Sequence, residues 1–300
     1  MGALNMRRLI AAGVAVSGMM LSPALAADLP VKVKPVPVYN WTGWYGGVNA
    51  GYGWQDKNAA AYTGDSLADP VTGQGRGAGT VFTDDLAISS LQAGADATNP
   101  TYRQSPRASG FTGGGQIGYN WQIERNWVAG FEADLQYANS KGDALFKAPD
   151  EGGVTLSAAS SHQLDWFGTL RGRIGYLLND RLLAFGTGGL AYGGTKGQAA
   201  ISIIGPLGWN IGFVTQILCP GFTTCLAGSS SQTSVGWTAG GGLEYAVLPH
   251  VTIKAEYLHI DLGDQNVKLT VQSPATGNGF VNVKFSNAYD IARMGMNLRF

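Results

Sequence analysis

The segment Trp127-Val128-Ala129-Gly130-Phe131-Glu132-Ala133-Asp134-Leu135-Gln136-Tyr137 alternates between apolar and other side chains. Every second residue from Trp127 is apolar, and Glu132, Asp134 and Gln136 fall on the opposite parity. Since successive side chains of a β-strand point to opposite faces, this alternation predicts a strand with one apolar and one polar face. About ten residues with this pattern are typical of a strand that crosses a membrane.

The pattern recurs on both sides of this segment, and it predicts eight strands in all. They are Trp44–Trp54, Gly110–Trp121, Trp127–Tyr137, Leu164–Leu177, Leu182–Tyr192, Ser234–Tyr245, Val251–His259 and Ala288–Phe300. The face that each residue of Leu182–Tyr192 occupies is ambiguous, because both of its parities are apolar or small.

The connectors between these strands alternate in length. Those after the second, fourth and sixth strands are short: Gln122–Asn126, Leu178–Arg181 and Ala246–His250. Those after the other strands are long: Gln55–Ser109, Ala138–Gln163, Gly193–Thr233 and Ile260–Asn287. Short periplasmic turns and long external loops are typical of bacterial barrels. We therefore predict an all-β fold: an eight-stranded antiparallel transmembrane β-barrel of up-and-down topology, with four long external loops and both barrel termini in the periplasm.

The aromatic residues on the apolar parity divide between the two ends of the predicted strands. At the periplasmic end stand Trp44, Tyr119, Trp121, Trp127, Tyr176, Tyr245 and Phe300. At the external end stand Tyr52, Trp54, Phe111, Tyr137, Trp166, Trp237 and Tyr257. Two aromatic belts are what the two lipid–water interfaces favour.

The first residues have the three parts of a secretory signal. Arg7 and Arg8 precede the uncharged apolar stretch Leu9–Leu21, and Ala24-Leu25-Ala26 matches a small-x-small cleavage site. The sequence therefore predicts a cleaved signal peptide over residues 1–26. No later run is long enough for a transmembrane helix.

The segment after the predicted cleavage site is rich in proline and lysine. Pro30, Pro35 and Pro37 favour an extended, solvated chain. We predict a periplasmic lead-in over residues 27–43 and the barrel over residues 44–300.

The composition gives no indication of a nucleic-acid partner. The chain has 20 basic and 20 acidic residues, so its formal net charge is zero, and no basic patch stands out. Charged residues make up 13%, which is about half the share usual in soluble domains. Composition alone also fits a soluble β-sandwich, but a sandwich gives no reason for short and long connectors to alternate along the chain.

Several motifs resemble the small outer-membrane surface-antigen β-barrels of alphaproteobacteria, also called porin-family or OmpA-like barrels. They are Trp41-Thr42-Gly43-Trp44-Tyr45-Gly46-Gly47 after the lead-in, Thr169-Leu170-Arg171-Gly172-Arg173-Ile174-Gly175-Tyr176, Gly188-Gly189-Leu190-Ala191-Tyr192-Gly193, Gly236-Trp237-Thr238-Ala239-Gly240-Gly241-Gly242-Leu243-Glu244-Tyr245, and the last strand ending in Phe300. The resemblance spans nearly the whole mature chain.

This resemblance implies a structural, non-enzymatic component of the cell envelope, without a cofactor, whose external loops contact lipopolysaccharide, a host or a ligand. Phe300, with alternate apolar residues before it, resembles the signal read by the barrel-assembly machinery. A narrow porin for small solutes is the alternative, and a lipid-modifying barrel enzyme is a third hypothesis. The sequence leaves the oligomeric state open.

Charged residues gather on the inward parity of the predicted strands. They are Glu132, Asp134, Arg171, Arg173, Glu244, Lys254, Glu256, Arg293 and Arg299. Glu132 and Arg171 stand at equal height on adjacent strands, so we expect them to be direct neighbours. Because side chains can fill an eight-stranded barrel, we predict a network that closes the lumen rather than a charge-lined pore.

Two cysteines, Cys219 and Cys225, lie in the third long connector. In an exported protein such a pair is expected to form a local disulfide. A metal site is disfavoured, because no histidine lies nearby and two ligands do not make a site.

Three other features of the sequence could carry chemistry. His162, beside Ser160 and Ser161, and His259, near Asp261, lie close to the predicted external rim, as catalytic residues of barrel enzymes do; no enzyme motif surrounds them, so solvated rim residues are the simpler interpretation. The run Gly73–Gly77 lacks the flanking strand and helix of a phosphate loop. Asp84-Asp85 lacks the spacing of a calcium loop, although a short helix is predicted around Asp84–Ala93.

Overall fold

The computed structural model describes residues 39–55, 60–65, 102–104, 106–149, 155–204, 209–211, 217–276 and 280–300. The chain divides into two units, residues 1–37 and 38–300. All described residues belong to the second unit. The predicted signal peptide, most of the predicted lead-in, the Gly73–Gly77 run, Asp84-Asp85 and the helix predicted around Asp84–Ala93 lie outside the described residues.

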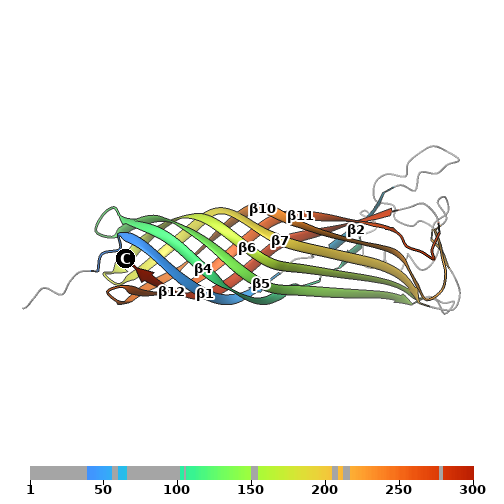
Figure 1. Cartoon of the computed structure of the whole chain (residues 1–300), viewed down its shortest axis with the longest axis horizontal. Coiled ribbons are helices and arrows are strands. Elements are labelled where there is room, and N and C mark those ends of the chain that lie inside the picture. The colour runs from blue at the N-terminus through green and yellow to red at the C-terminus, as the bar shows by residue number, and fades with distance from the viewer. Residues whose placement is uncertain are drawn as a thin grey trace, which may run out of the picture. The chain divides into compact units, whose positions relative to one another are not determined.

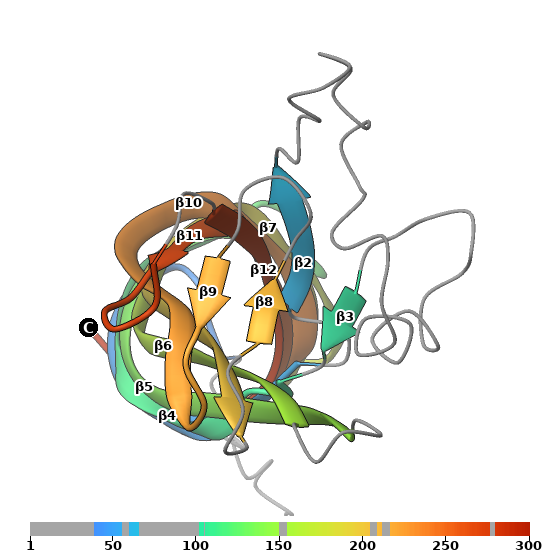
Figure 2. The ribbon, with the colours of Figure 1, turned by 90° about the vertical axis from the view of Figure 1, so that its right-hand side faces the viewer.

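Eight antiparallel strands form a closed ring, as the alternation predicts (Figures 1 and 2). In ring order they are β1 (Gly43–Trp54), β4 (Ser109–Gln122), β5 (Trp127–Pro149), β6 (Thr155–Asn179), β7 (Leu182–Ile204), β10 (Thr223–Leu248), β11 (Val251–Val271) and β12 (Phe280–Arg299). The pairing of β1 with β12 closes the ring, with Tyr45 opposite Arg299 and Trp54 opposite Asp290. Because every strand has two neighbours within the ring, its backbone groups are satisfied without water, which is what a strand in lipid requires.

The predicted strand bounds are wrong at one end. Six strands, β5 to β12 of the ring, continue well beyond the external aromatic belt, whereas β1 and β4 end there (Figure 1). The predicted loops Ala138–Gln163, Gly193–Thr233 and Ile260–Asn287 are therefore largely strand. We call this part of the sheet the external extension: residues 138–149, 155–165, 193–204, 223–236, 258–271 and 280–289.

The connectors contain further short strands that the sequence did not predict. Within the first long connector, β2 (Ala60–Asp65) pairs with β12 and with β3 (Tyr102–Gln104). Within the third, β8 (Trp209–Ile211) pairs with β9 (Ile217–Cys219). The three short turns lie between β4 and β5, β6 and β7, and β10 and β11, as predicted. Among the described residues, no helix is long and apolar enough to cross a membrane.

The outward face of the ring is apolar between the two aromatic belts. Leu135, Leu170, Ile174 and Leu243 are among its exposed residues, and the belt residues flank them. The structure shows which residues of β7 face the lumen, a point that the sequence left ambiguous. Leu183, Phe185 and Ala191 are buried inside the ring, whereas Leu190 and Tyr192 are exposed on its outer face.

The lumen is filled along its length by three buried apolar clusters. Trp41, Val128, Leu177, Leu183, Phe185 and Ala246 form the first, at the end with the short turns. Leu164, Phe167, Leu258, Ile260, Tyr289 and Ile291 belong to the second, at the level of the external belt and beyond it. The third lies in the external extension and includes Ile201, Leu226, Val267, Leu269, Val283 and Phe285.

The end of the predicted lead-in buries one side chain, Trp41, whereas Asn40 and Thr42 are exposed. Trp41 is fully buried, and its indole Nε1 donates a hydrogen bond to the Asp180 carbonyl oxygen at 3.3 Å. Its backbone N donates to Gln122 Oε1 at 3.1 Å. The ring of Tyr39 packs edge-on against Trp41. The indole of Trp41 therefore packs into the opening of the lumen at the end with the short turns.

Candidate functional site: a charge network in the lumen

The charged side chains of the lumen come from five strands. Glu132 and Asp134 lie on β5, Arg171 and Arg173 on β6, and Glu244 on β10. Lys254 and Glu256 follow on β11, and Arg293 on β12. Strand register pairs Glu132 with Arg171, Glu244 with Lys254, and Glu256 with Arg293. Opposite charges therefore face each other across three strand pairs, which is the arrangement that stabilises a sheet.

Arg171 contacts three carboxylates. Its Nη1 lies 2.7 Å from Glu256 Oε1, and its Nη2 lies 3.0 Å from Asp134 Oδ2. The same Nη2 makes a short contact with Glu132 Oε1. The guanidinium fork has its donors fixed in one plane, so it can hold groups from different strands at once.

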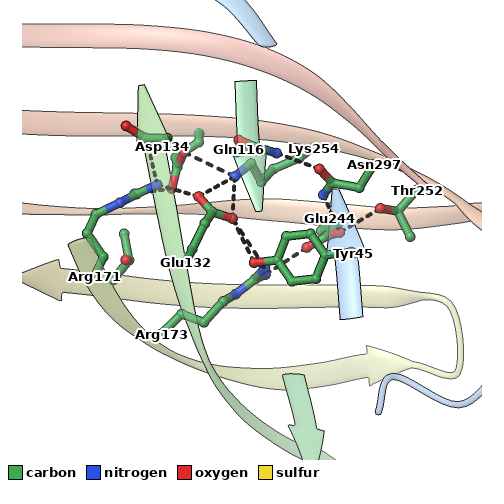
Figure 3. A network of polar contacts seen from close by, with 12 residues as sticks. Tyr45, Gln116, Glu132, Asp134, Arg171, Arg173, Glu244, Thr252, Lys254 and Asn297 are labelled. Carbon is green, nitrogen blue, oxygen red and sulfur yellow. Dashed lines mark hydrogen bonds and ion pairs between the residues drawn. The ribbon is translucent and has the colours of Figure 1, made fainter. Parts of the chain in front are cut away.

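Glu132 lies at the centre of the network (Figure 3). Lys254 Nζ donates to both of its oxygens at 2.9 Å. On the far side, Arg293 Nη2 lies 2.8 Å from Asp134 Oδ2 and 2.7 Å from Glu256 Oε2. The network thus joins β5, β6, β11 and β12 across the lumen.

A second part of the network is built on Arg173. Its Nη2 lies 2.7 Å from Glu244 Oε2, and its Cζ lies 4.2 Å from the centre of the Phe185 ring. Tyr45 links the two parts: its hydroxyl donates to Glu132 Oε2 at 2.8 Å and accepts from Arg173 Nη1 at 3.1 Å. Figure 3 shows this tyrosine reaching into the cluster.

Tyr45 is a site residue that the sequence reasoning missed. It stands on the same parity as Asn49, which marks the inward face of β1, so the signal was present. Gly118 on β4 lies between Tyr45 and Glu132 in the register, and a Cβ atom there would collide with the Tyr45 ring. Asn49 and Gln116 extend the polar layer through a 3.0 Å hydrogen bond.

The network is electrically balanced and closed to solvent. It contains four carboxylates and four cations, and each of these side chains is at most 3% exposed. Burying an isolated charge is costly, but here every charge has at least one opposite partner and hydrogen bonds. The cluster blocks the lumen at this level.

Arg299 does not join the network, contrary to the sequence prediction. It makes none of the ion pairs found among the described residues. Instead, its guanidinium lies 5.1 Å from the Tyr39 ring centre and 5.4 Å from that of Trp41. The alternation places Arg299 inside correctly, but it could not foresee that the lead-in turns back and presents two aromatic faces to this arginine.

His162 and His259 both make hydrogen-bond contacts with side chains of β12, Asn287 and Asp290 respectively. His162 is fully buried in the external extension, and its Nε2 lies 2.7 Å from Asn287 Oδ1. Ser160 is buried, whereas Ser161 lies on the opposite face of β6. His162 therefore does not lie at a solvated rim.

His259 lies on the outer face, and its partner differs from the one suggested by sequence proximity. Its Nδ1 lies 2.7 Å from Asp290 Oδ1, which also accepts a 2.7 Å hydrogen bond from the Tyr257 hydroxyl. Asp290 is the register partner of His259 on β12. Asp261 instead accepts a hydrogen bond from the Gly263 backbone N at 2.9 Å.

The cysteines and the last residue complete the predicted set. Cys225 is disulfide-bonded and buried. The side chain of Cys219 lies outside the described side chains, so the Cys219–Cys225 pairing stays a prediction. Phe300 is exposed, and its backbone N donates to the Trp44 carbonyl oxygen at 3.1 Å. Within the described ranges, no three His, Cys, Asp or Glu side chains gather as a metal site.

Residues 12–287 match the family defined by the outer membrane protein beta-barrel domain. The chain belongs to this family. This outer-membrane barrel protein is similar to the 31 kDa outer-membrane immunogenic protein of Brucella melitensis biotype 1, with 31% identity over 98% of this chain and 100% of that one. It is also similar to the 22 kDa outer membrane protein of Rhizobium leguminosarum bv. viciae, with 30% identity over 62% of this chain and 66% of the other.

Two solved structures are also similar to this outer-membrane barrel. The outer membrane protein OprG from Pseudomonas aeruginosa matches with a TM-score of 0.41 and 13% identity, over 87% of this chain and 98% of its own. The outer membrane protease OmpT from Escherichia coli matches with a TM-score of 0.39 and 11% identity, over 86% of this chain and 97% of its own.

Proposed function

We propose that this protein is a closed, non-conducting and non-enzymatic component of the outer membrane. The observation that carries this proposal is the balanced charge network, which is buried and spans the lumen from β5 to β12. Apolar clusters lie on both sides of it. A porin needs a continuous aqueous path, and the buried charge network with apolar clusters on both sides of it argues against one.

The proposal includes an orientation. We place the short turns and both barrel termini in the periplasm and the external extension outside the cell, because bacterial barrels have short periplasmic turns. It also includes processing near Ala27 and recognition of Phe300 by the barrel-assembly machinery. The exposed end of the sheet is then the part that contacts the cell surface and its surroundings.

The absence of enzymatic activity is also proposed. Supporting it, His162 is fully buried among aromatic rings, where a substrate would have no access. His259 has an acidic partner, Asp290, but Tyr257 shares that carboxylate. A lipid-hydrolysis assay tests this part: activity lost in both His162→Gln and His259→Gln variants would contradict it.

Cysteine labelling on intact cells tests the orientation. Asn266, exposed on β11 in the external extension, and Glu124, exposed in the turn after β4, offer a matched pair. We expect a membrane-impermeant maleimide to label Asn266→Cys and to leave Glu124→Cys unlabelled until the outer membrane is opened. The reverse pattern would overturn the orientation.

A deletion strain tests the envelope role. We expect the deletion to increase the sensitivity of cells to detergent and to leave the uptake rate of small solutes unchanged. Reduced uptake of small solutes, restored by the gene on a plasmid, would favour the narrow porin instead.

A further inference from the structure

The outer face of the external extension contains a groove of about 820 Å³. It crosses four neighbouring strands, β5, β6, β7 and β10. Its volume lies within the roughly 300–1,000 Å³ range of sites that bind small molecules. The lumen network takes no part in it, because none of the charged residues of that network lines the groove.

Two rows of side chains line the groove, and the strand register fixes them. The first row runs from Asp143 through Ser161 and Gln198 to Ser229. The second row, further from the membrane, contains Ala159 and Ala200 as register partners. A carboxylate, an amide and two hydroxyls thus stand beside an apolar row formed by Leu145, Ala159, Ala200 and Ala227. Sugars fit such a surface, since each ring has hydroxyl groups at its edge and an apolar C–H face.

A third row lies on the membrane side of the groove. Lys141 pairs in register with Gln163, and Gln163 pairs with Lys196. Lys196 Nζ lies 2.8 Å from Asp165 Oδ2, yet about half of the lysine side chain is exposed. Because alternate residues of a strand rise by about 7 Å, the two lysines lie about one such step from the polar row.

The aromatic belt comes next toward the membrane. Trp166 on β6 is the register partner of Tyr137, and its ring packs against Tyr192. Belts of this kind mark the lipid–water interface. The two lysines therefore stand where the phosphates of an outer-leaflet lipid lie, and the groove stands where its sugars begin.

The charge on this face is asymmetric. Beyond the external belt, β5, β6, β7, β10 and the segment before β4 expose four cations, Arg107, Lys141, Lys147 and Lys196, against Asp143 and Asp165. The opposite face, on β11 and β12, carries Lys268 and Lys284 against Asp261 and Asp264. Counting the lysine, arginine and aspartate side chains that the structure describes in this region, the groove face has a net charge of +2 and the opposite face a net charge of 0.

We propose that this groove binds the phosphorylated core saccharide of lipopolysaccharide, the anionic glycolipid of the outer leaflet. Lys141 and Lys196 contact its phosphates, and the two groove rows contact its sugar rings. The inference rests on the proposed orientation, since only an external groove meets this lipid.

The test uses the refolded full-length protein in detergent, titrated with rough-type lipopolysaccharide and with free lipid A, and read by native mass spectrometry. We expect the Lys141→Gln/Lys196→Gln double variant to bind both probes more weakly, by about five-fold for each lysine. The matched control is Lys268→Gln/Lys284→Gln, which removes two charges on the opposite face and should leave affinity unchanged. Lys284 suits this control because it too is exposed and ion-paired, with Asp264 at 2.7 Å.

A second variant separates the sugar contact from the charge. Ala200→Trp fills the groove without changing charge, so it should reduce the affinity for rough-type lipopolysaccharide to that for lipid A. Equal weakening by the two double variants, or no effect of Ala200→Trp, would overturn the inference. Failure of Asn266→Cys to label on intact cells would instead overturn the orientation, and binding in detergent would still report on the groove itself.

Discussion

At the scale of single residues, Glu132 and Arg171 carry the closure of the lumen. Each has further partners: Lys254 for the glutamate, and Asp134 and Glu256 for the arginine. Either single change leaves an excess charge in a buried cluster, whereas the double change restores balance. The loss of stability should therefore depend more on the net charge left in the cluster than on which of the two residues is replaced.

A double-mutant cycle with Glu132→Gln and Arg171→Gln tests this balance. We expect each single variant to lose roughly 2–3 kcal/mol of unfolding free energy, at or below the lower end of the ~3–5 kcal/mol for breaking a buried pair. The double variant should lose less than either. Denaturant unfolding of the refolded protein measures this, and additive losses would refute the pairing. The exposed pair Lys284 and Asp264 is the control, with a coupling of about 0.5 kcal/mol.

His162 gives the external extension a dependence on pH. It lies beyond Trp166, outside the membrane-spanning part, between the rings of Phe285 and Tyr289. Burial lowers the pKa of its imidazole to about 4. The hydrogen bond with Asn287 raises this pKa, but by less than burial lowers it. The folded protein therefore holds this histidine neutral at a pH where the unfolded chain would protonate it.

The sign of the effect follows from this lowered pKa. The stability contribution is present above the unfolded pKa of about 6.5 and is lost as the pH falls toward 4, by up to about 3 kcal/mol. We expect amide hydrogen exchange in the external extension to accelerate between pH 6.5 and pH 4. His162→Gln should remove most of this dependence. An unchanged pH profile in that variant would show that another group is responsible.

For single residues, the sequence predicts which side chains face inward but not all of the contacts that they make there. Parity alone placed Glu132 opposite Arg171, because alternation and connector lengths fix both the face and the height of a residue. Tyr45 has the inward parity as well, but as an uncharged residue it was not singled out. Parity placed Arg299 inside, but its aromatic partners depend on the path of Tyr39 and Trp41. That path has no periodic signal, so only the structure reveals it.

At the scale of elements, the membrane-crossing halves of the strands were predictable and the external extension was not. Within lipid, one face of a strand must be apolar, and this produces the alternation. The register shifts between Tyr137 and Ser140, and again between Leu164 and Trp166, at the level of the external belt. On β6 the bulge reverses the parity, because Trp166 faces outward whereas Leu164 is buried, so the alternation breaks although the strand continues. On β5 the parity is kept, since Tyr137 and Lys141 are both exposed. Beyond lipid both faces tolerate polar residues, as in the Ser229–Thr233 run.

The segment before β1 packs into the mouth of the barrel at the end with the short turns, and Trp41 is its buried residue. Replacing this fully buried indole with alanine should cost about 3 kcal/mol of unfolding free energy, as for other buried tryptophans. Ile123→Ala is the control, because Ile123 is 68% exposed in the neighbouring turn. Urea unfolding of the two variants compares them. A loss from Trp41→Ala no larger than that of the control would show that the segment only rests against the barrel.

The predicted Cys219–Cys225 bridge would join the end of β9 to the start of β10, where Cys225 is buried in the apolar cluster of the external extension. A loop of this length should gain about 2 kcal/mol on the chain-entropy model. We expect reduction to loosen the connector and to leave the barrel folded, as read by far-UV circular dichroism and heat-modifiable migration on gels. Free thiols in the unreduced protein would refute the bridge, and unfolding of the barrel on reduction would refute the peripheral position of the loop.

At the scale of the whole molecule, the ring is a sequence of layers. An aromatic mouth, a balanced charge network and two apolar clusters follow each other along the lumen. On the outside, lipid-facing apolar residues give way to an aromatic belt, a lysine row and a groove. In the proposed function and orientation, the inner layers close the barrel and the outer layers face successive layers of the membrane, so the two faces of the same strands have different roles.

Conductance of the refolded full-length protein in a planar bilayer tests the closed lumen most directly. The buried network and the filled mouth predict that the wild-type protein inserts without producing a stable open level over the physiological voltage range. Insertion is checked separately by protease protection in the same lipid. A steady ohmic conductance from correctly inserted wild-type protein would contradict the closed lumen and favour the narrow porin.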